Sequence, residues 1–279
     1  MAGRKRPPLP DLPVVETFDR VREALTRAKR AIVVAPPGAG KTTLVPLALL
    51  DEPWLAGGAI VMLEPRRLAT RAAARRMAEL LGESVGDTVG YQTRDERRIG
   101  PGTRIEVVTE GILTRRLQND AELPGVGLVI FDEVHERNLP TDLGLALALD
   151  VARTIRPDLR LLAMSATPDT AALAAALGDA PVVESAGRVF PVDLRWRPTD
   201  RKSRIEQVTA DAVRAAVREE SGDVLVFLPG IGEILRCRDR LQTEVGPDVD
   251  VRPLAGALTT TEQDLALAPS PPGRRRVVL

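Results

Sequence analysis

The run APPGAGKTT at residues 35–43 combines glycine, lysine and threonine at a spacing that suits phosphate binding. Glycines let backbone N–H groups turn onto phosphate oxygens, while a lysine reaches the β and γ oxygens and a threonine hydroxyl ligates Mg²⁺. The run lies between an apolar stretch and a helical pattern, as a phosphate-binding loop requires, although Ala35 replaces the usual leading glycine. The residues expected to bind a nucleotide are Pro37, Gly38, Ala39, Gly40, Lys41, Thr42 and Thr43.

A second run, LVIFDEVH at residues 128–135, places two acids directly after four apolar residues. A buried strand would deliver Asp132 to its carboxyl end, where phosphate-loop enzymes hold Mg²⁺, and Glu133 could orient and deprotonate the attacking water. His135 is the only histidine of the chain, and its place two residues after the acids favours a functional role over a structural one. We expect catalysis from Lys41, Asp132, Glu133 and His135, with Mg²⁺ held by Thr42 and Asp132.

Three further motifs follow in the order of a known family. They are PRR at residues 65–67, TEG at 109–111 and SAT at 165–167, which together with GAGKT and DEVH make five ordered motifs. On these motifs the chain resembles the superfamily 2 helicases of the DEAH/RHA group, and APPGAGKTT, TEGILTRRL and FDEVHERNLPTDLGLALALD most resemble the bacterial HrpB branch. The resemblance covers essentially residues 14–279. Val134 replaces the alanine of the family name, which this branch tolerates.

The resemblance implies an ATP-dependent RNA helicase that couples NTP hydrolysis to translocation on single-stranded nucleic acid. It implies that ATP or another NTP binds with Mg²⁺, that Arg76 stacks on the adenine, and that Ser165 and Thr167 couple hydrolysis to strand movement. The residues that it places against the nucleic-acid backbone are Arg66, Arg67, Thr109, Glu110 and Gly111. Backbone contacts position a strand without reading its sequence, so single-stranded RNA is the expected partner and DNA stays open. The alternatives are a solvated helix face for the arginines and a plain turn for SAT.

The motifs stand between strand and helix patterns that alternate along the chain. Short apolar runs are typical of buried parallel strands, and stretches rich in Ala, Leu and Arg with apolar residues at helical spacing predict helices. The predicted strands are residues 31–34, 59–63, 105–108, 128–131 and 160–164, and the predicted helices are 42–50, 69–81, 142–154 and 170–177. This alternation predicts an α/β fold with a parallel sheet flanked by helices, and the resemblance makes it a RecA-like P-loop NTPase.

A change of character after residue 177 predicts a domain boundary near residues 185–190. We expect a RecA-like, ATP-binding domain at 14–187, a partial second RecA-like domain at 188–279, and a disordered, basic and proline-rich tail at 1–13.

The second domain shows the same alternation of strand and helix patterns. They predict strands at 192–196 and 223–228, a helix near 204–219, and a buried strand at the end of the chain. Phe227 ends an apolar run and is expected in the core, the alternative being one face of the adenine site.

The composition of the chain excludes several classes of protein and of binding site. Apolar residues make up 44% and charged residues 28% of the 279 residues, which is ordinary for globular domains and enough for two of them. With 39 basic and 39 acidic residues, and only 3% aromatic residues, contact with nucleic acid must be local and not built on a stacking platform. No apolar run approaches the roughly 20 residues of a membrane span, and a single cysteine offers neither a disulfide nor a zinc site. We expect a cytoplasmic monomer without zinc or membrane attachment.

In the family, motifs V and VI follow the segment that matches the end of this chain, and motif VI supplies arginines to the ATP site. An arginine finger raises the rate by about 10³ to 10⁵ in phosphate-loop NTPases. We therefore expect this chain to bind nucleotide and nucleic acid but to hydrolyse ATP slowly. The alternatives are a P-loop NTPase of another class and a nucleotide- or RNA-binding module without catalysis, which RNA-stimulated ATPase activity would separate.

Overall fold

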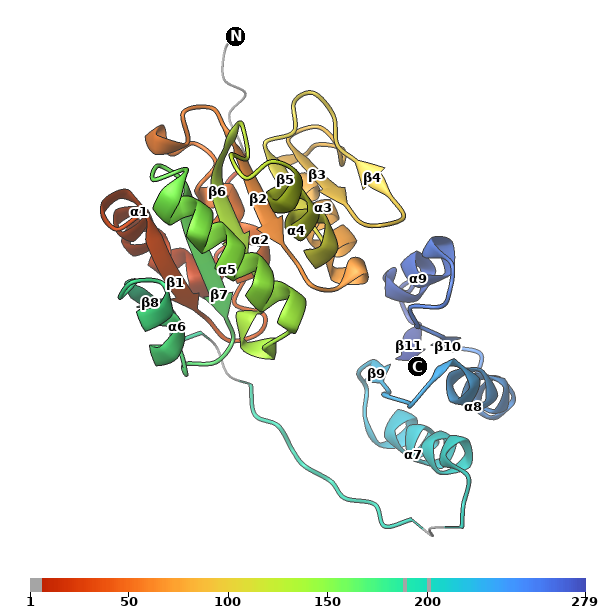
Figure 1. Ribbon diagram of the computed structural model, residues 1–279. Helices are drawn as coiled ribbons and strands as arrows, with labels where there is room; N and C mark the ends of the chain where they lie inside the picture. Colours follow the sequence, from red (N-terminus) through yellow and green to blue (C-terminus); the bar gives the residue numbers. More distant parts are fainter. Residues whose placement is uncertain (1–6, 188–189, 200–201) are drawn as a thin grey trace. The chain divides into compact units, whose positions relative to one another are not determined.

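The computed structural model describes residues 7–187, 190–199 and 202–279 and divides into two compact units, Met1–Phe190 and Pro191–Leu279 (Figure 1). Each unit has its own sheet with helices packed against it, so the predicted α/β class is confirmed. Among the described residues, no helix is both long and apolar enough to cross a membrane.

Unit 1 is built on an eight-stranded sheet in the order β4-β3-β5-β2-β6-β7-β1-β8. Neighbouring strands pair in parallel except β3 and β4. The strands are β1 (Arg30–Val34), β2 (Ala59–Leu63), β3 (Val89–Gln92), β4 (Arg97–Arg98), β5 (Ile105–Val108), β6 (Val126–Phe131), β7 (Arg160–Ser165) and β8 (Val182–Glu184). The five strands predicted for this part are present, and β3, β4 and β8 are additional.

Helices cover both faces of this sheet (Figure 1). One face packs against α1 (Phe18–Arg27), α2 (Lys41–Ala48) and α3 (Arg67–Leu81). The other face packs against α4 (Glu110–Asn119), α5 (Leu139–Thr154) and α6 (Ala171–Ala176). Short 3-10 turns complete the unit as η1 (Pro13–Thr17), η2 (Pro53–Leu55) and η3 (Val134–Glu136). The four helices predicted here are present with ends shifted by up to three residues, whereas α1 and α4 are additional.

Each central strand contributes to two cores, because successive strand side chains point to opposite faces of the sheet. In β2, Ile60 and Met62 pack towards α1, α2 and α3, whereas Val61 and Leu63 pack towards α4, α5 and α6. All four side chains are fully buried. A strand that is covered on both faces has an unbroken run of apolar residues in its sequence. This is why the apolar run at residues 59–63 predicted β2.

All five motifs lie at the carboxyl edge of the unit 1 sheet. APPGAGKTT follows β1, PRR follows β2, TEG follows β5, DEVH follows β6, and SAT spans the end of β7. Their strand ends are in register, since Leu63 pairs with Val108 and Phe131, and Val34 pairs with Ser165. Motifs far apart in the sequence therefore meet where ligands bind in open α/β sheets.

Residues 7–13 pack against unit 1, so the prediction of a disordered tail is wrong for this stretch. Leu9 and Leu12 contact the core on the α1 side, and the backbone N–H of Val14 donates to the Ala39 carbonyl at 3.1 Å. Apolar contacts from these leucines outweigh the proline-rich composition that indicated disorder. Residues 1–6 of the predicted tail lie outside the described residues.

Unit 2 holds a three-stranded parallel sheet in the order β10-β11-β9. Its elements are α7 (Ile205–Glu219), β9 (Val224–Leu225), α8 (Ile231–Glu244), β10 (Val249–Arg252), α9 (Thr260–Leu267) and β11 (Arg275–Val278). Its small core includes Val213, Cys237, Leu241 and Val277. The helix predicted near 204–219 and the strand predicted at the end of the chain are confirmed.

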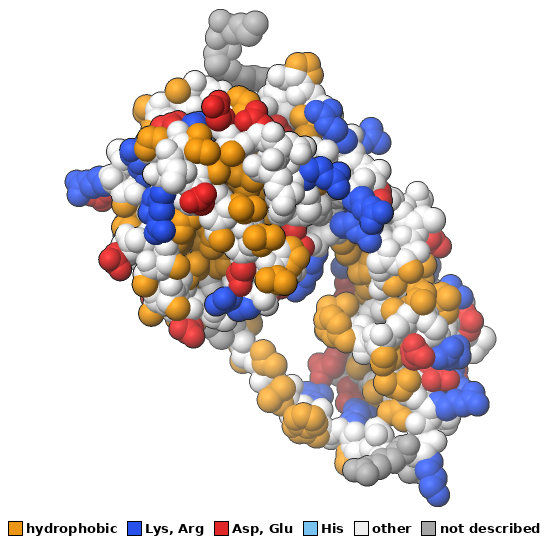
Figure 2. All heavy atoms as spheres, in the orientation of Figure 1, with side chains coloured by type: hydrophobic (Ala, Val, Ile, Leu, Met, Phe, Trp, Pro, Cys, Tyr) orange, Lys and Arg blue, Asp and Glu red, His pale blue; other side chains and the backbone are white. Residues whose placement is uncertain are grey.

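One expectation for the start of unit 2 and two for the region of β9 are not met. Residues 192–196 form no strand; they are extended, and their apolar side chains stand out into solvent (Figure 2). Their alternating pattern suits a strand, but within the described parts of the chain no strand pairs with them. The strand predicted over 223–228 shortens to β9, and Phe227, expected in the core, is 87% exposed.

The two tryptophans of the chain lie in different units and in different surroundings. Trp54 in η2 is half-buried, and the guanidinium carbon of Arg160 lies 4.4 Å from its ring centroid, a cation–π contact. Trp196, at the start of unit 2, is 89% exposed.

Candidate nucleotide-binding and hydrolysis site

The phosphate-binding loop turns sharply between β1 and α2. Gly38 and Gly40 have φ angles of 77° and 93°, in the left-handed region that glycine tolerates, and Gly40 is the N-cap of α2. A Cβ at Gly40 would also lie only 2.8 Å from Cδ1 of Leu12. The loop therefore needs glycine here, and it leads into a helix N-terminus, where backbone N–H groups favour anions.

Two side chains at the start of α2 contact the two acids at the end of β6. Nζ of Lys41 lies 3.0 Å from Oε1 of Glu133, and the Thr42 hydroxyl donates to Oδ2 of Asp132 at 2.6 Å. Lys41 is only 5% exposed, so Glu133 neutralises a largely buried cation. The structure thus brings together the residues that were predicted from two separate motifs.

Asp132 is fully buried, and burial raises the pKa of its carboxyl to about 6. The hydrogen bond from Thr42 and the charge of Lys41 act in the opposite direction and lower this pKa. A nearby cation favours the ionised form of a carboxyl, so a divalent ion would hold Asp132 as carboxylate. Together with the Thr42 hydroxyl it offers the oxygen ligands that Mg²⁺ prefers, with phosphate oxygens and water completing the shell.

His135 lies between the acid pair and the SAT turn. Its Nδ1 lies 3.3 Å from Oε2 of Glu133 and 3.2 Å from the backbone nitrogen of Ala166. Nδ1 can accept the Ala166 N–H only when it carries no proton, and it can pair with Glu133 only when it carries one. Nδ1 can therefore hydrogen-bond only one of these two neighbours at a time.

The SAT residues form a tight turn beside the phosphate-binding loop. The backbone N–H of Thr167 donates to Oγ of Ser165 at 3.1 Å, and Oγ of Ser165 donates to the Thr167 carbonyl at 2.9 Å. The N–H of Ala35 donates to the Ser165 carbonyl at 3.0 Å. SAT is thus joined directly to the residue that opens the loop, and through Ala166 to His135.

The PRR and TEG residues lie at the same sheet edge, apart from the Lys41 cluster. Arg66 pairs with Glu136, and Nη1 of Arg67 lies 2.5 Å from Oδ2 of Asp95. Both arginine side chains are mostly exposed, and exposed ion pairs are weak enough to be exchanged for phosphate.

TEG opens helix α4. Thr109 is the N-cap of that helix and Gly111 lies in its first turn. The Thr141 hydroxyl donates to Oε1 of Glu110 at 3.0 Å, and burial raises the pKa of this carboxyl. The side chain of Glu110 therefore contacts α5.

Helix α3 carries four arginines, Arg67, Arg71, Arg75 and Arg76, for which a solvated helix face is the plain alternative to a role in binding. Arg76, expected to stack on the adenine, is exposed and lies 3.3 Å from Glu79 in an ion pair. Arg71 differs, because it is 7% exposed and Nη1 lies 3.5 Å from Oε2 of Glu96. A solvated helix face is therefore wrong for Arg71.

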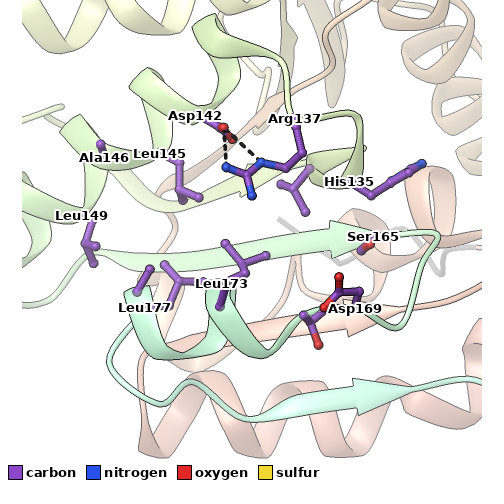
Figure 3. Close-up of a pocket in the computed structure, with 14 residues that line it drawn as sticks. His135, Arg137, Asp142, Leu145, Ala146, Leu149, Ser165, Asp169, Leu173 and Leu177 are labelled. Carbon is purple, nitrogen blue, oxygen red and sulfur yellow. Dashed lines mark hydrogen bonds and ion pairs between the residues drawn. The ribbon is translucent and has the colours of Figure 1, made fainter.

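A pocket of about 360 Å³ opens next to His135 and Ser165, between α5 and α6 (Figure 3). Its floor is apolar and is formed by Leu145, Leu149, Leu173 and Leu177. At its rim Arg137 donates to Oδ2 of Asp142, at 3.0 and 3.2 Å. No residue of the phosphate-binding loop lines this pocket, so the pocket is separate from the loop.

Glu64 is a buried acid of the site that sequence reasoning missed. It follows β2 directly, is 3% exposed, and accepts the N–H of Arg66 at 3.4 Å. Burial, followed by the negative charge of Asp132, raises its pKa to about 8. The available signal was an acid at the end of an apolar run, immediately before PRR.

Glu64 should make the protein less stable as pH rises. Between the ordinary value of 4.5 and about 8, the folded state keeps a proton that the unfolded state has lost, so the free energy of unfolding falls with pH. We expect the resulting loss of unfolding free energy between pH 5 and pH 9 to be on the order of 4 kcal/mol and to vanish in Glu64→Gln. Urea unfolding at about pH 5 and pH 9 measures it, with the exposed Glu79→Gln as control. Equal pH slopes in Glu64→Gln and the parent chain would contradict the assignment.

The sequence model of the DEAD/DEAH box helicases matches residues 19–175, which is more than half of the chain. The chain belongs to the DEAD/DEAH box helicase family. The phosphate-binding loop, PRR, TEG, DEVH and SAT all fall within the matched residues of this helicase family member.

Curated relatives agree with the family. The ATP-dependent RNA helicase HrpB of Escherichia coli K12 is 51% identical over 96% of this chain and 33% of its own length. An ATP-dependent RNA helicase HrpA homolog of Haemophilus influenzae is 33% identical over 96% of this chain and 21% of its length. The human probable ATP-dependent RNA helicase DHX34 is also 33% identical, over 24% of its length. The chain thus spans about a third or less of the length of these curated relatives.

Solved structures also match this helicase-family chain, among them two of HrpB. A crystal structure of Escherichia coli DEAH/RHA helicase HrpB has a TM-score of 0.88 and 51% identity, over 96% of this chain and 34% of that one. A crystal structure of the E. coli DExH-box NTPase HrpB has a TM-score of 0.76 and 50% identity, over 98% and 34%. The resemblance to the HrpB branch inferred from the motifs is confirmed.

Proposed function

We propose that this protein is an ATP-dependent RNA helicase, which couples NTP hydrolysis to translocation on single-stranded nucleic acid. The observation that carries the proposal is the contact of Lys41 with Glu133 and of Thr42 with Asp132 at one sheet edge. Similarity to HrpB over nearly the whole chain supports it. In this proposal residues 14–187 form the ATP-binding domain and residues 188–279 belong to a second RecA-like domain.

The side chains of the site divide the chemistry between them. Lys41 leaves Glu133 to bind the β and γ phosphates, and the freed carboxylate of Glu133 orients the attacking water and accepts its proton. Thr42 and Asp132 would hold Mg²⁺, which would supply positive charge beside the phosphates. His135 can exchange the Ala166 N–H for Glu133 as the partner of its Nδ1, so that a change at the hydrolysis site reaches the SAT turn.

Nucleic acid is proposed to bind along the PRR and TEG side of the same edge. Arg66 and Arg67 exchange their acidic partners for phosphates, and the N-terminus of α4 offers the backbone N–H groups of Glu110 and Gly111 and the hydroxyl of Thr109. Such contacts do not read bases, which suits an enzyme that moves along a strand. Arg76 is proposed to stack on the adenine of the bound nucleotide.

The test is ATP turnover with and without single-stranded RNA, measured alongside ADP and ATP binding. We expect nucleotide to bind with Mg²⁺ and RNA to raise the hydrolysis rate several-fold, even from a slow basal rate. Hydrolysis that is indifferent to RNA would indicate a P-loop enzyme of another class. Binding without RNA-dependent turnover would indicate a nucleotide-binding module without helicase catalysis.

A further inference from the structure

The segment that leaves unit 1 is tied to the N-terminal part of the chain. This exit segment, residues 185–187, follows β8 and leads towards unit 2. One carboxylate oxygen, Oε1 of Glu16, accepts both the Ser185 hydroxyl at 3.0 Å and the Ala186 N–H at 3.2 Å. Nearby, Nη2 of Arg20 donates to the Glu184 carbonyl at 2.8 Å. Glu16 therefore fixes the path of the backbone at the exit.

The exit segment also packs directly on the phosphate-binding loop. Gly187 has a φ of 65°, and a Cβ added there would overlap the ring of Pro36, the second residue of the loop. The N–H of Ser185 donates to the Val34 carbonyl at 2.9 Å, just before the loop. Only glycine tolerates this φ angle and also lets the backbone lie so close to the Pro36 ring. Gly187 and Pro36 are therefore in tight contact, with no room for a side chain between them.

The far end of the loop rests on the same N-terminal part. The Val14 N–H donates to the Ala39 carbonyl at 3.1 Å, and Leu12 fills the space beside Gly40. The loop is therefore held at Pro36 by the exit segment and at residues 39–40 by residues 12–14. Glu16, a few residues further on, joins these two supports to each other.

We propose that Glu16 and Gly187 are positioning residues for the phosphate-binding loop, and that through them nucleotide binding is coupled to the exit segment. The inference rests on the proposed nucleotide site. Phosphates bind the backbone of residues 38–42, and any accompanying shift of Pro36 must displace Gly187, because packed contacts transmit small movements. In return, displacing the exit segment should weaken nucleotide binding, since coupling between two sites is reciprocal.

Substitution of Gly187 tests the contact with Pro36. Gly187→Ala should raise the Kd for ADP by about tenfold or more. Gly82→Ala is the matched control, because Gly82 has a similar φ of 67° but nothing within 4 Å of its added Cβ. Pro36→Ala removes the ring that the new methyl group meets, so it should restore much of the affinity of Gly187→Ala in the double variant. A purely structural effect of backbone strain would show no such rescue.

Substitution of Glu16 tests the second support. Glu16→Ala should weaken ADP binding and Glu16→Gln, which keeps one acceptor oxygen, should restore it, with the exposed Glu23→Ala of α1 as control. ADP should also change hydrogen exchange at the amides of Ser185 and Ala186 in the parent chain.

The outcomes separate the two proposals. If the parent chain does not bind ADP, the proposed nucleotide site itself fails. If the parent chain binds ADP but exchange at 185–186 is unchanged and Gly187→Ala binds ADP normally, only the coupling is overturned. Gly187→Ala that loses affinity without rescue by Pro36→Ala also overturns it.

Discussion

Replacing Lys41 with alanine is expected to abolish measurable ADP and ATP binding and to lower residual ATP turnover by about 10² to 10³. Lys41 is the buried cation of the phosphate-binding loop, at the start of α2. Without its ammonium, the phosphates would enter a site whose nearest side chains, Asp132 and Glu133, are both acidic. Electrostatic repulsion from these acids would then act against binding instead of being offset.

Calorimetric titration of ADP with Mg²⁺ measures this effect, with thermal unfolding as a check on folding. Lys29→Ala is a suitable control, because Lys29 is exposed and donates to the Pro157 carbonyl at 3.0 Å, away from the loop. A folded Lys41→Ala variant that binds ADP as tightly as the parent chain would show that the nucleotide lies elsewhere.

Glu133→Gln is expected to have the opposite signature, with nucleotide binding kept and turnover lowered by about 10² to 10⁴. The amide has the same shape as the carboxylate but cannot accept a proton from the attacking water. It also releases Lys41 from its ion pair, since the 3.0 Å contact loses its negative charge. ADP and ATP should therefore bind at least as tightly as to the parent chain.

Single-turnover hydrolysis with protein in excess over labelled ATP isolates the chemical step, even where turnover is slow. Glu122→Gln, on the exposed turn after α4, controls for a change of charge alone. A hydrolysis rate of Glu133→Gln within a few-fold of that of the parent chain would show that Glu133 is not the general base. Asp132 or His135 would then be the candidates for that role.

The sequence predicted the carboxyl edge of unit 1 well, because each motif follows a strand that is buried on both faces. Such strands form apolar runs that end where the polar motif begins, as at Phe131 and Asp132. The same reasoning missed α1, although Phe18, Val21 and Leu25 stand at helical spacing and are buried. It also missed β8, which has three residues and too little length to form a pattern.

The wrong predictions concern segments whose structure depends on tertiary contacts. An alternating pattern at residues 192–196 indicates a strand, yet a strand forms only when a neighbour supplies its hydrogen bonds. Composition predicted disorder for residues 7–13, but it could not show that Leu9 and Leu12 pack against the core of unit 1. Within the site, Glu64 could be named from the sequence, but its burial beside Asp132 follows from the register of β2 and β6.

The placement of Trp54 and Trp196 gives the chain two optical reporters, one in each unit. Trp54, covered by the Arg160 guanidinium, should emit towards the blue and resist quenching by acrylamide. Trp196 is almost fully exposed and should emit towards the red and be quenched readily. Denaturation of unit 1 would therefore appear as a change in the blue, protected part of the emission. A conformational change confined to unit 2 would alter only the red, quenchable part of the emission. A single spectrum therefore distinguishes changes in unit 1 from changes in unit 2 without any added label.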